Sequence, residues 1–474
     1  MRSAYLYSLS IAFLLLACSK NLMVDAPNPN ERPTGVYRVM ENPQDLTGDA
    51  EKGFKYLTTG DYIGSGIPIS LFKKSMEKFT DTILDREGSN KHIVHENIAF
   101  RAFNGAEVVS GSCFSCHSSA AYSLDGKVIF GLGGPGTNFQ ANLPRQWKLL
   151  KVIANRASRK SPLEKEAFAH YNQWFQPALD YVQTTNPLVN PAFRLEEAYA
   201  MHRNPVDLTY SAEPQFEMNA FNIASDVPPL WNLKKKKALY YNGMGRGDYS
   251  KVLMQASTQG TVDSTTARAV QQNFKDVIAW LYSLEPPKFP GEIDKQLARR
   301  GEEIFTSSCE KCHGTYGRLP YYPNKIVPLD EIKTDPLYAQ YFAQQSNLAQ
   351  WYNSSWFAQS PPQSELKVSA GYMAPPLDGV WATAPYLHNA SIPTLEDLLD
   401  TSQRPTYWSV EKTPQGLAYE IDDKIGLEYV VKEDHKDKGT FDTSQPGYGN
   451  QGHDFGDELS AIERRAVIEY LKTL

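Results

Sequence analysis

The amino-acid sequence predicts an all-α, mainly helical protein with long loops, built from two tandem copies of one unit. Two repeats predict this arrangement. The pentapeptide Cys-x-x-Cys-His occurs at 113–117 and 309–313, and the pattern V-I-x-[W/Y]-L-x-[S/T]-L occurs at 277–284 and 467–474. Both repeats recur at nearly the same offset, so each copy should begin near a pentapeptide and close with a helix. Strand signals are sparse and short, which favours helices and loops.

The N-terminus has the pattern of an export signal. A positive charge at Arg2 precedes an apolar run over 4–17 that ends at Cys18, and this run is too short to span a bilayer. Residues 15–18, Leu-Leu-Ala-Cys, resemble the bacterial lipobox, in which the cysteine becomes the lipid-modified first residue. We therefore expect a signal peptide over 1–17 and a lipid anchor on Cys18 in the bacterial cell envelope, facing the periplasm or the cell exterior. The alternative is an ordinary signal peptide with an incidental cysteine.

Prolines mark the borders of the two units. Residues 21–34 contain three prolines, three asparagines and one aspartate, a composition that predicts a flexible, lipid-anchored tether over 18–50. Residues 285–290, Glu-Pro-Pro-Lys-Phe-Pro, end the first closing helix, because a helix cannot continue through this run. We expect the first unit over 51–287 and the second over 288–474.

Helices are predicted on both sides of the second pentapeptide. Over 292–305 the apolar residues fall largely on one helical face, and Ser460 with Glu463 forms a capping box that starts the closing helix. We expect these two helices to pack across each other beside the pentapeptide. In the first unit the corresponding stretch, 56–103, is longer and richer in glycine, which predicts loops.

The pentapeptides are typical of covalent haem attachment. Two thiols can add to the vinyl groups of a haem while the adjacent imidazole binds the iron from one face. The predicted attachment points for two haem c groups are Cys113, Cys116, Cys309 and Cys312. The predicted proximal iron ligands are His117 and His313. Both units would then be cytochrome-c-like domains.

Other uses of these cysteines are less consistent with the pattern. Halves of a four-thiolate zinc site are usually close in sequence, whereas these lie far apart. A redox-active thiol pair or structural disulfides remain possible, yet neither requires a histidine after the second cysteine. The pentapeptides and Cys18 use all five cysteines, and the formal net charge of −6 argues against nucleic acid as a partner.

The segment 226–248 predicts an ordered loop over the first haem. Trp231 in this loop would relay electrons between the haems or shape the distal pocket, and the alternative is a core tryptophan that fixes the loop. Lysines fill 234–237. A solvated face is the simpler interpretation of that run, and a docking patch for an acidic electron donor is the alternative.

A third group of motifs lies in the second unit. Residues 374–381 read Ala-Pro-Pro-Leu-Asp-Gly-Val-Trp, residues 384–389 read Ala-Pro-Tyr-Leu-His-Asn, and residues 393–395 read Pro-Thr-Leu. With the two pentapeptides, these motifs resemble the dihaem cytochrome c peroxidase superfamily, which includes the methylamine dehydrogenase maturase and the haem-type rubber oxygenases. The resemblance covers most of the chain after the tether. The segments 64–68, 228–231 and 452–455 are most similar to the rubber-oxygenase branch.

The resemblance implies unequal roles for the two haems. One iron keeps a protein ligand on both faces and transfers electrons, whereas the other keeps an open or displaceable position. By resemblance, His453 is the distal ligand of the second haem, and the alternatives are Met373 and His388. The better-known peroxidases carry a methionine after the Pro-Tyr-x-His segment, but 398–404 contains none.

The first haem has no distal ligand that the sequence identifies. His170 and His202 lie in the first unit, but a lone histidine is more often a surface or core residue. The sequence also does not identify the acid or base that peroxide chemistry would need.

The resemblance implies a peroxidase-like oxidoreductase. Electrons from a small redox protein or a quinol-derived donor would enter at the second haem and reach hydrogen peroxide at the first. The alternatives are a dioxygen-using oxygenase that acts on an apolar substrate and an electron-transfer cytochrome without a substrate. The membrane would be contacted through the lipid anchor only. The family also allows a calcium ion between the units, although no acidic cluster in the sequence demands one.

Overall fold

The computed structural model describes residues 37–39, 43–76, 80–119, 127–134, 139–157, 161–219, 221–257, 260–413, 416–422 and 424–474. The predicted signal peptide, Cys18 and most of the predicted tether lie outside these residues. Residues Arg38–Leu474 form one compact unit. None of the described helices is long and apolar enough to cross a bilayer.

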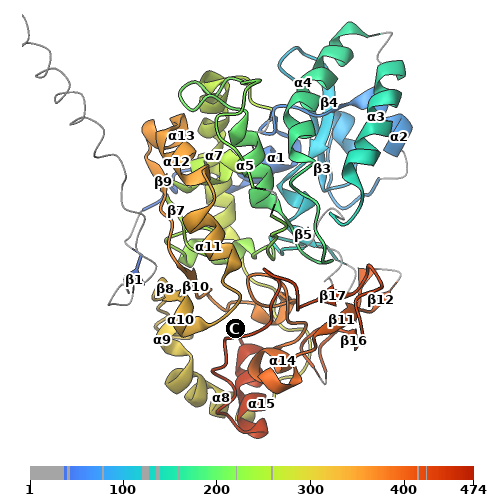
Figure 1. Cartoon of the computed structure of the whole chain (residues 1–474). Coiled ribbons are helices and arrows are strands. Elements are labelled where there is room, and N and C mark those ends of the chain that lie inside the picture. Colours follow the sequence, from blue (N-terminus) through green and yellow to red (C-terminus); the bar gives the residue numbers. More distant parts are fainter. Residues whose placement is uncertain are drawn as a thin grey trace, which may run out of the picture. The chain divides into compact units, whose positions relative to one another are not determined.

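Helices supply most of the regular structure (Figure 1). The α-helices are α1 (Ala50–Thr59), α2 (Ile69–Met76), α3 (Leu143–Ala157), α4 (Pro162–Ala178), α5 (Ala192–Met201), α6 (Tyr249–Ser257), α7 (Ser264–Ser283), α8 (Lys295–Ser308), α9 (Glu310–His313), α10 (Leu329–Ile332), α11 (Leu337–Gln344), α12 (Leu348–Ser354), α13 (Trp356–Gln359), α14 (Leu395–Leu399) and α15 (Ala461–Leu471). The 3-10 helices are η1 (Gly88–His92), η2 (Cys113–Ser115), η4 (Leu230–Lys235), η5 (Val380–Ala382) and η6 (Thr401–Gln403).

Short strands accompany these helices. They are β1 (Tyr37–Arg38), β2 (Ile67–Pro68), β3 (Asn97–Arg101), β4 (Glu107–Gly111), β5 (Ser118–Ser119), β6 (Ile129–Phe130), β7 (Gly245–Gly247), β8 (Lys325–Pro328), β9 (Ser364–Leu366), β10 (Gly371–Met373), β11 (Tyr407–Val410), β12 (Lys412–Thr413), β13 (Gly416–Leu417), β14 (Tyr419–Glu420), β15 (Gly426–Leu427), β16 (Tyr429–Val431) and β17 (Phe441–Asp442). The sheets include β2-β4-β3, β16-β11-β17 and the pair β7-β9.

The prediction of an all-α fold is therefore wrong. The described residues form several small antiparallel sheets beside the helices, so the fold is mixed α and β and does not divide plainly into two helical cytochrome domains. The strands were missed because most are too short to show alternation of apolar and polar residues. The boundary near Pro287 stays a prediction.

One hairpin carried a sequence signal that could have predicted it. Strands β3 and β4 pair in antiparallel register from Asn97 opposite Gly111 to Arg101 opposite Glu107. Gly105 in the connecting turn has a φ of +82°, a conformation that glycine adopts easily. Asn-Gly dipeptides such as Asn104-Gly105 are therefore common in hairpin turns.

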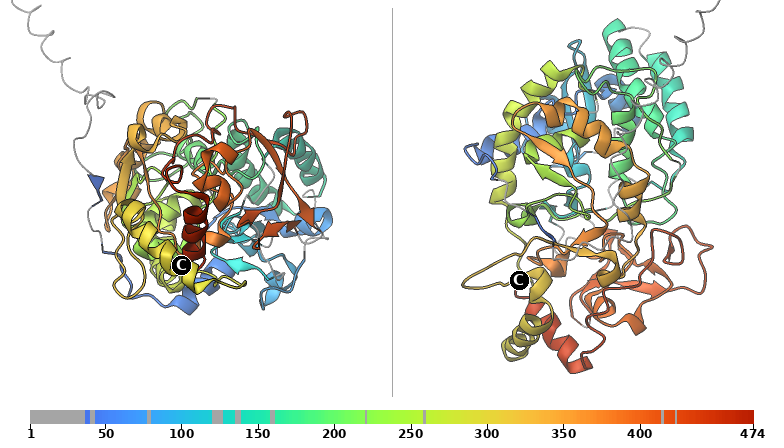
Figure 2. Two further views of the ribbon diagram at one scale, coloured as in Figure 1. Left: turned by 90° about the horizontal axis from the view of Figure 1, so that it is seen from below. Right: turned by 60° about the vertical axis from the view of Figure 1, so that its left-hand side comes forward.

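Two helix pairs cross at a glycine. A Cβ atom on Gly301 of α8 would lie 1.9 Å from the carbonyl oxygen of Ala466 in α15, so only glycine allows this close approach. A Cβ atom on Gly53 of α1 would similarly lie 2.0 Å from the carbonyl oxygen of Asp276 in α7. Figures 1 and 2 show α8 and α15 side by side. The predicted crossing beside the second pentapeptide is confirmed, and the first pair repeats it.

The predicted start of α15 is also confirmed. Ser460 accepts a hydrogen bond from the backbone of Glu463, and the Glu463 side chain accepts one from the backbone of Ser460. This capping box fixes the first turn of the helix that packs against α8.

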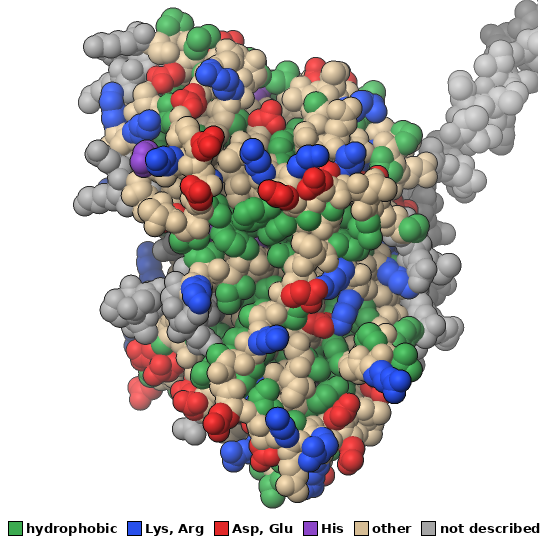
Figure 3. Space-filling model, turned by 180° about the vertical axis from the view of Figure 1, so that it is seen from behind, with side chains coloured by type: hydrophobic (Ala, Val, Ile, Leu, Met, Phe, Trp, Pro, Cys, Tyr) green, Lys and Arg blue, Asp and Glu red, His purple; other side chains and the backbone are tan. Residues whose placement is uncertain are grey.

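The exposed side chains on the face shown in Figure 3 carry charges of both signs. Lysine and arginine alternate there with aspartate and glutamate, and hydrophobic side chains gather in a band between the charged regions. This face therefore has no extended patch of a single sign.

Candidate functional site

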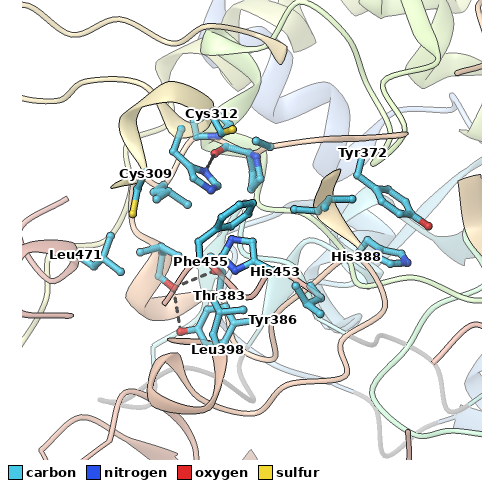
Figure 4. Close-up of a pocket in the computed structure, with 18 of the residues that line it drawn as sticks. Cys309, Cys312, Tyr372, Thr383, Tyr386, His388, Leu398, His453, Phe455 and Leu471 are labelled. Carbon is cyan, nitrogen blue, oxygen red and sulfur yellow. Dashed lines mark hydrogen bonds between the residues drawn. The ribbon is translucent and has the colours of Figure 1, made fainter. Parts of the chain in front are cut away.

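A cavity that is partly open to solvent lies against the second pentapeptide. Cys309, Cys312 and His313 form one side of its wall, and His453 comes from a distant loop (Figure 4). Much of the remaining wall is apolar and includes Phe305, Leu377, Val380, Leu395, Val467 and Leu471. A wall of this kind suits a large, flat and mostly apolar group.

Both pentapeptides fold into the same helical turn. The backbone N–H of His117 donates to the carbonyl of Cys113 at 3.0 Å, and that of His313 donates to the carbonyl of Cys309 at 3.1 Å. Burial raises the pKa of the Cys113 and Cys309 thiols to about 11 each. The thiols are therefore protonated at neutral pH, unlike the low-pKa cysteines of redox-active pairs.

The His313 imidazole is oriented by the backbone. Its Nδ1 lies 2.9 Å from the carbonyl oxygen of Pro375, so Nδ1 donates and Nε2 is left as the metal-binding nitrogen. Burial lowers the pKa of His313, which keeps the imidazole neutral, the form that binds iron. Pro375 belongs to the Ala-Pro-Pro-Leu motif at 374–377.

His453 faces His313 across the cavity. The ring centroids are 6.2 Å apart, which matches two imidazoles sharing one metal ion, since two metal–nitrogen bonds of about 2 Å and two ring radii come to about 6 Å. Burial, followed by the neighbouring His313 and Arg404, lowers the pKa of His453 to about 3. Its Nδ1 is buried and has no hydrogen-bond partner among the described residues.

The loop that carries His453 is held by several backbone contacts. The Arg404 guanidinium donates to the carbonyls of Asn450 and Gly452 at 2.7 Å each and to that of His453 at 3.2 Å. Gly452 has a φ of +73°, and a Cβ atom there would lie 2.2 Å from the carbonyl carbon of Lys333. These contacts hold the backbone that carries the His453 imidazole.

The other two ligand candidates lie elsewhere on the cavity wall. His388 stacks on Tyr372 with ring centroids 4.1 Å apart, and burial lowers the pKa of His388 to about 3. Met373 lies in β10 within a small apolar cluster that includes Ile326. Figure 4 shows His388 and Tyr372 to one side of His453 rather than across from the second pentapeptide. The distal ligand itself stays a prediction.

The first pentapeptide lies against the larger core cluster, in which its Phe114 is buried and against which Cys113 packs. Cys113 donates from its backbone N–H to the Tyr62 hydroxyl at 3.2 Å, and the Asn190 amide donates to the Cys116 sulfur at 3.1 Å. Burial lowers the pKa of His117 to about 4, and its Nδ1 has no partner among the described residues. The imidazole is thus neutral and suited to bind iron.

The two lone histidines of the first unit are tied to the backbone. His170 Nε2 lies 2.8 Å from the carbonyl of Gly260, and His202 Nδ1 lies 3.0 Å from that of Ser211. Each ring therefore has a structural partner. Neither contact points to iron ligation.

The segment 226–248 contains η4 and β7, and it lines the cavity of the second pentapeptide, where Pro228, Pro229 and Asn232 form part of the wall. Trp231 is fully buried, and its indole N–H donates to the carbonyl of Asp378 at 2.7 Å. The amide of Asn232 donates to the carbonyl of Pro376 at 3.0 Å. The motif at 228–231 thus packs against the motif at 374–381.

The residues around the second pentapeptide fit a covalent haem, and the first pentapeptide presents the same attachment residues. Each pentapeptide presents two cysteines and a neutral histidine, and the second adds an apolar cavity with an opposing imidazole. The four described cysteines are unpaired, and no group of three or more His, Cys, Asp or Glu side chains in the described part could hold a metal ion. Calcium binding stays a prediction.

Sequence reasoning missed several residues of the site. The carbonyl of Pro375 and the Arg404 clamp carry no sequence signal, because both act through the backbone of distant loops. His95, which is buried, has Nδ1 2.6 Å from an Asp81 carboxylate oxygen and lies edge-on to Phe130, a ring that packs on Phe114 of the first pentapeptide. Nothing in the sequence marks this pair.

The second pentapeptide, its apolar cavity and the opposing His453 have the features of a haem c site. Residues 371–409, from β10 to β11, match the family model described as RoxA-like, cytochrome c-like. The matched segment includes Pro375 and His388 and contains neither pentapeptide. The match supports haem c as the cofactor.

The chain is also similar to two proteins of Sinorhizobium fredii (strain NBRC 101917 / NGR234). It is 30% identical to "Uncharacterized protein y4iJ" over 263 residues, and this aligned region covers 40% of this chain and 41% of that protein. It is 25% identical to "Uncharacterized protein y4iM" over 316 residues, and this aligned region covers 58% of this chain and 70% of that protein. The match thus spans less than half the length of y4iJ.

Proposed function

We propose that the chain is a dihaem c-type oxidoreductase of the peroxidase-like kind, which takes electrons at the second site and reduces hydrogen peroxide at the first. The observation that carries the proposal is the pairing of His313 and His453 across one cavity. Two imidazoles leave no free position for a small oxidant at that site, which suits electron transfer. When bound, each haem supplies an iron centre that changes oxidation state by one electron.

The chain's own residues orient the second site. The carbonyl of Pro375 fixes the His313 tautomer, and Arg404 fixes the loop of His453. The apolar wall lowers the local polarity around the bound group. In the first unit, the backbone contacts of His170 and His202 argue against these two histidines as ligands of the first site. His95 is the histidine that lies near the first pentapeptide, and its Nδ1 is held by Asp81.

A short route through the chain supports Trp231 as a relay between the two sites. Gly131 donates from its N–H to the carbonyl of His117 at 2.8 Å and accepts from the N–H of Leu230 at 2.8 Å. Trp231 follows Leu230, and its indole N–H donates to the carbonyl of Asp378. Asp378 lies three residues after Pro375, and the carbonyl of Pro375 accepts a hydrogen bond from His313. Trp231 is our candidate for the residue that couples the sites.

The same proposal includes export, a lipid anchor on Cys18, and electron supply by a small redox protein or a quinol-derived donor. It also includes the expected division into haem domains at 51–287 and 288–474. Peroxide reduction outside the cytoplasm needs a donor that reaches the cell envelope, and a lipid anchor would keep the enzyme there.

The second candidate is an oxygenase that acts on an apolar substrate with dioxygen. The RoxA-like family match at 371–409 favours it, together with the resemblance of 64–68, 228–231 and 452–455 to the rubber-oxygenase branch. An electron-transfer cytochrome without a substrate is the third reading, and it requires protein ligands on both faces of both irons.

Electron paramagnetic resonance of the oxidised and half-reduced protein tests the proposal. We expect one low-spin haem that is indifferent to added peroxide and one haem whose signal changes on peroxide addition, together with oxidation of a reduced donor protein. Two low-spin haems that resist peroxide and cyanide would contradict both enzyme candidates. Dioxygen uptake with an apolar substrate, without peroxide turnover, would favour the oxygenase.

A further inference from the structure

The lysine run at 234–237 is divided among different environments. Lys234 pairs with Glu285, and Lys235 pairs with both carboxylate oxygens of Asp378 at 2.6 and 2.7 Å. Lys236 instead lines the cavity that holds His313 and His453. The run is therefore not one solvated face.

Lys236 is partly buried and has no anionic partner among the described residues. Desolvation alone lowers the pKa of Lys236 to about 8, and no carboxylate lies within ion-pair distance of it among the described residues. An ammonium group that is removed from water is unfavourable unless a negative group compensates it. This arrangement indicates that an anion belongs beside Lys236 in the functional protein.

The nearby cavity wall has no such anion of its own. Asp226 also lines the cavity, but burial raises the pKa of its carboxyl to about 8, so it is largely protonated at neutral pH. Its carboxyl accepts from the Tyr241 hydroxyl at 2.9 Å. The missing negative group therefore has to come from the molecule that occupies the cavity.

Two further polar atoms on the same wall lack partners. Thr334 Oγ1 and His388 Nε2 are buried and have no hydrogen-bond partner among the described residues, and both residues line the cavity. Thr334 is only 4% exposed and His388 only 5%. A buried polar group without a partner is costly, so these atoms also point to an occupant that is polar at this side.

We propose that Lys236 binds a carboxylate of the haem held by the second pentapeptide and thereby raises the reduction potential of that haem. The inference rests on the proposed dihaem function. A haem is apolar over most of its area and carries carboxylates at one edge, which matches a mostly apolar wall that also includes Lys236, Thr334 and His388. The other lysine on the wall, Lys311, is 58% exposed and lies 3.8 Å from Glu331, so it is a poorer partner for a buried carboxylate.

The reduction potential is the readout because charge acts on it directly. The ferric haem carries one more positive charge than the ferrous haem, so a nearby cation favours the ferrous state. Removing the cation leaves the carboxylate uncompensated and favours the ferric state. Folding defects alone would not produce a shift confined to one of two haems.

The test compares Lys236→Met, Lys236→Arg and Lys234→Met in the full chain. Lys234 lies in η4, the 3-10 helix that ends just before Lys236, and it pairs with Glu285 outside the cavity wall, so it controls for loss of a lysine. Spectroelectrochemical titration should show a ferrous-to-ferric ratio about tenfold lower in Lys236→Met at a fixed potential, a shift of about 59 mV for one electron. The shift should affect the low-spin haem alone, and Lys236→Arg and Lys234→Met should titrate like the parent protein.

Haem content separates this inference from the proposed function. If the parent protein lacks two covalent haems, the proposed function fails. If all variants carry two haems and Lys236→Met titrates like the parent, or Lys234→Met shifts equally, the role of Lys236 is overturned. If Lys236→Met loses the second haem, recovery of that haem in Lys236→Arg supports the inference and failure to recover it counts against it.

Discussion

The indole N–H of Trp231 donates a 2.7 Å hydrogen bond to the carbonyl oxygen of Asp378. This bond joins the Pro-Pro-Leu-Trp motif of the first half to the Ala-Pro-Pro-Leu-Asp motif of the second. Pro375, three residues before Asp378, accepts the hydrogen bond that orients His313. The two motifs that carry the family resemblance therefore support each other in space, although they are far apart in the sequence.

Trp231→Phe tests this connection. The change leaves the part-buried carbonyl of Asp378 without its donor, which should lower the free energy of unfolding by about 1 kcal/mol beyond the loss of packing. If Trp231 is the relay, electron transfer between the haems should also slow. Urea denaturation measures the first effect, and flash reduction followed by absorbance measures the second.

Trp408→Phe is the matched control for stability. Trp408 is fully buried and stacks on Phe441 with centroids 5.1 Å apart, and its indole nitrogen has no hydrogen-bond partner among the described residues. The Trp408→Phe variant should lose packing only and should leave the rate of electron transfer between the haems unchanged. Equal destabilisation by both changes, with equal rates, would remove the special role of Trp231.

His453→Gly tests the distal ligand of the second haem. Removing the imidazole that faces His313 should abolish the low-spin signal of that haem, because one ligand is lost. Met373→Leu should leave the signal unchanged. Electron paramagnetic resonance at low temperature reads both variants, and an unaltered low-spin signal in His453→Gly would show that another residue binds the iron.

Gly452→Ala tests the loop that positions His453. A left-handed backbone costs a residue with a Cβ about 1–2 kcal/mol, and here the Cβ would also lie 2.2 Å from the carbonyl carbon of Lys333. We expect a loss of stability greater than 2 kcal/mol together with a disturbed spectrum of the second haem.

Gly105→Ala is the control for that variant. Gly105 also has a positive φ, of +82°, but a Cβ there meets no atom within 4 Å. It should cost about 1–2 kcal/mol and leave the haem spectrum unchanged. Similar behaviour of the two variants in urea denaturation and in absorbance would indicate that the contact at Lys333 is unimportant.

Glu196 predicts a dependence of stability on pH. Burial raises the pKa of Glu196 to about 8 from an ordinary value of 4.5, and its carboxyl accepts from the Tyr240 hydroxyl at 2.6 Å. Between these values the folded chain holds a proton that the unfolded chain has released, so stability falls as pH rises. The slope from this group is at most about 1.4 kcal/mol per pH unit.

Glu196→Gln should flatten that slope, because the amide does not titrate. Urea midpoints measured from pH 5 to pH 8 would show the difference between the two proteins. Parallel slopes for the parent and the variant would mean that Glu196 ionises normally in the folded chain.

The sequence predicted the local elements of the site better than the fold around it. The crossing of α8 with α15 and the capping box at Ser460 follow from helical periodicity and local hydrogen bonding, which a sequence displays directly. The sheets were missed because strands such as β5 and β10 are too short for a periodic pattern. Their pairing depends on distant segments.

The chemistry of the site divides in the same way. The pentapeptides are contiguous, so spacing alone identifies Cys309, Cys312 and His313. His453 was chosen by resemblance, and only the folded chain places it opposite His313. Lys236 looked like part of a solvated run, because its burial depends on the cavity wall rather than on its neighbours in sequence.

The most direct test of the account is the number of covalently attached haems per chain in the purified full-length protein. A pyridine haemochrome spectrum calibrated against chain concentration measures it. The account predicts two thioether-linked haems for each chain. A single haem per chain, or haem that is extracted by acidified solvent, would contradict it.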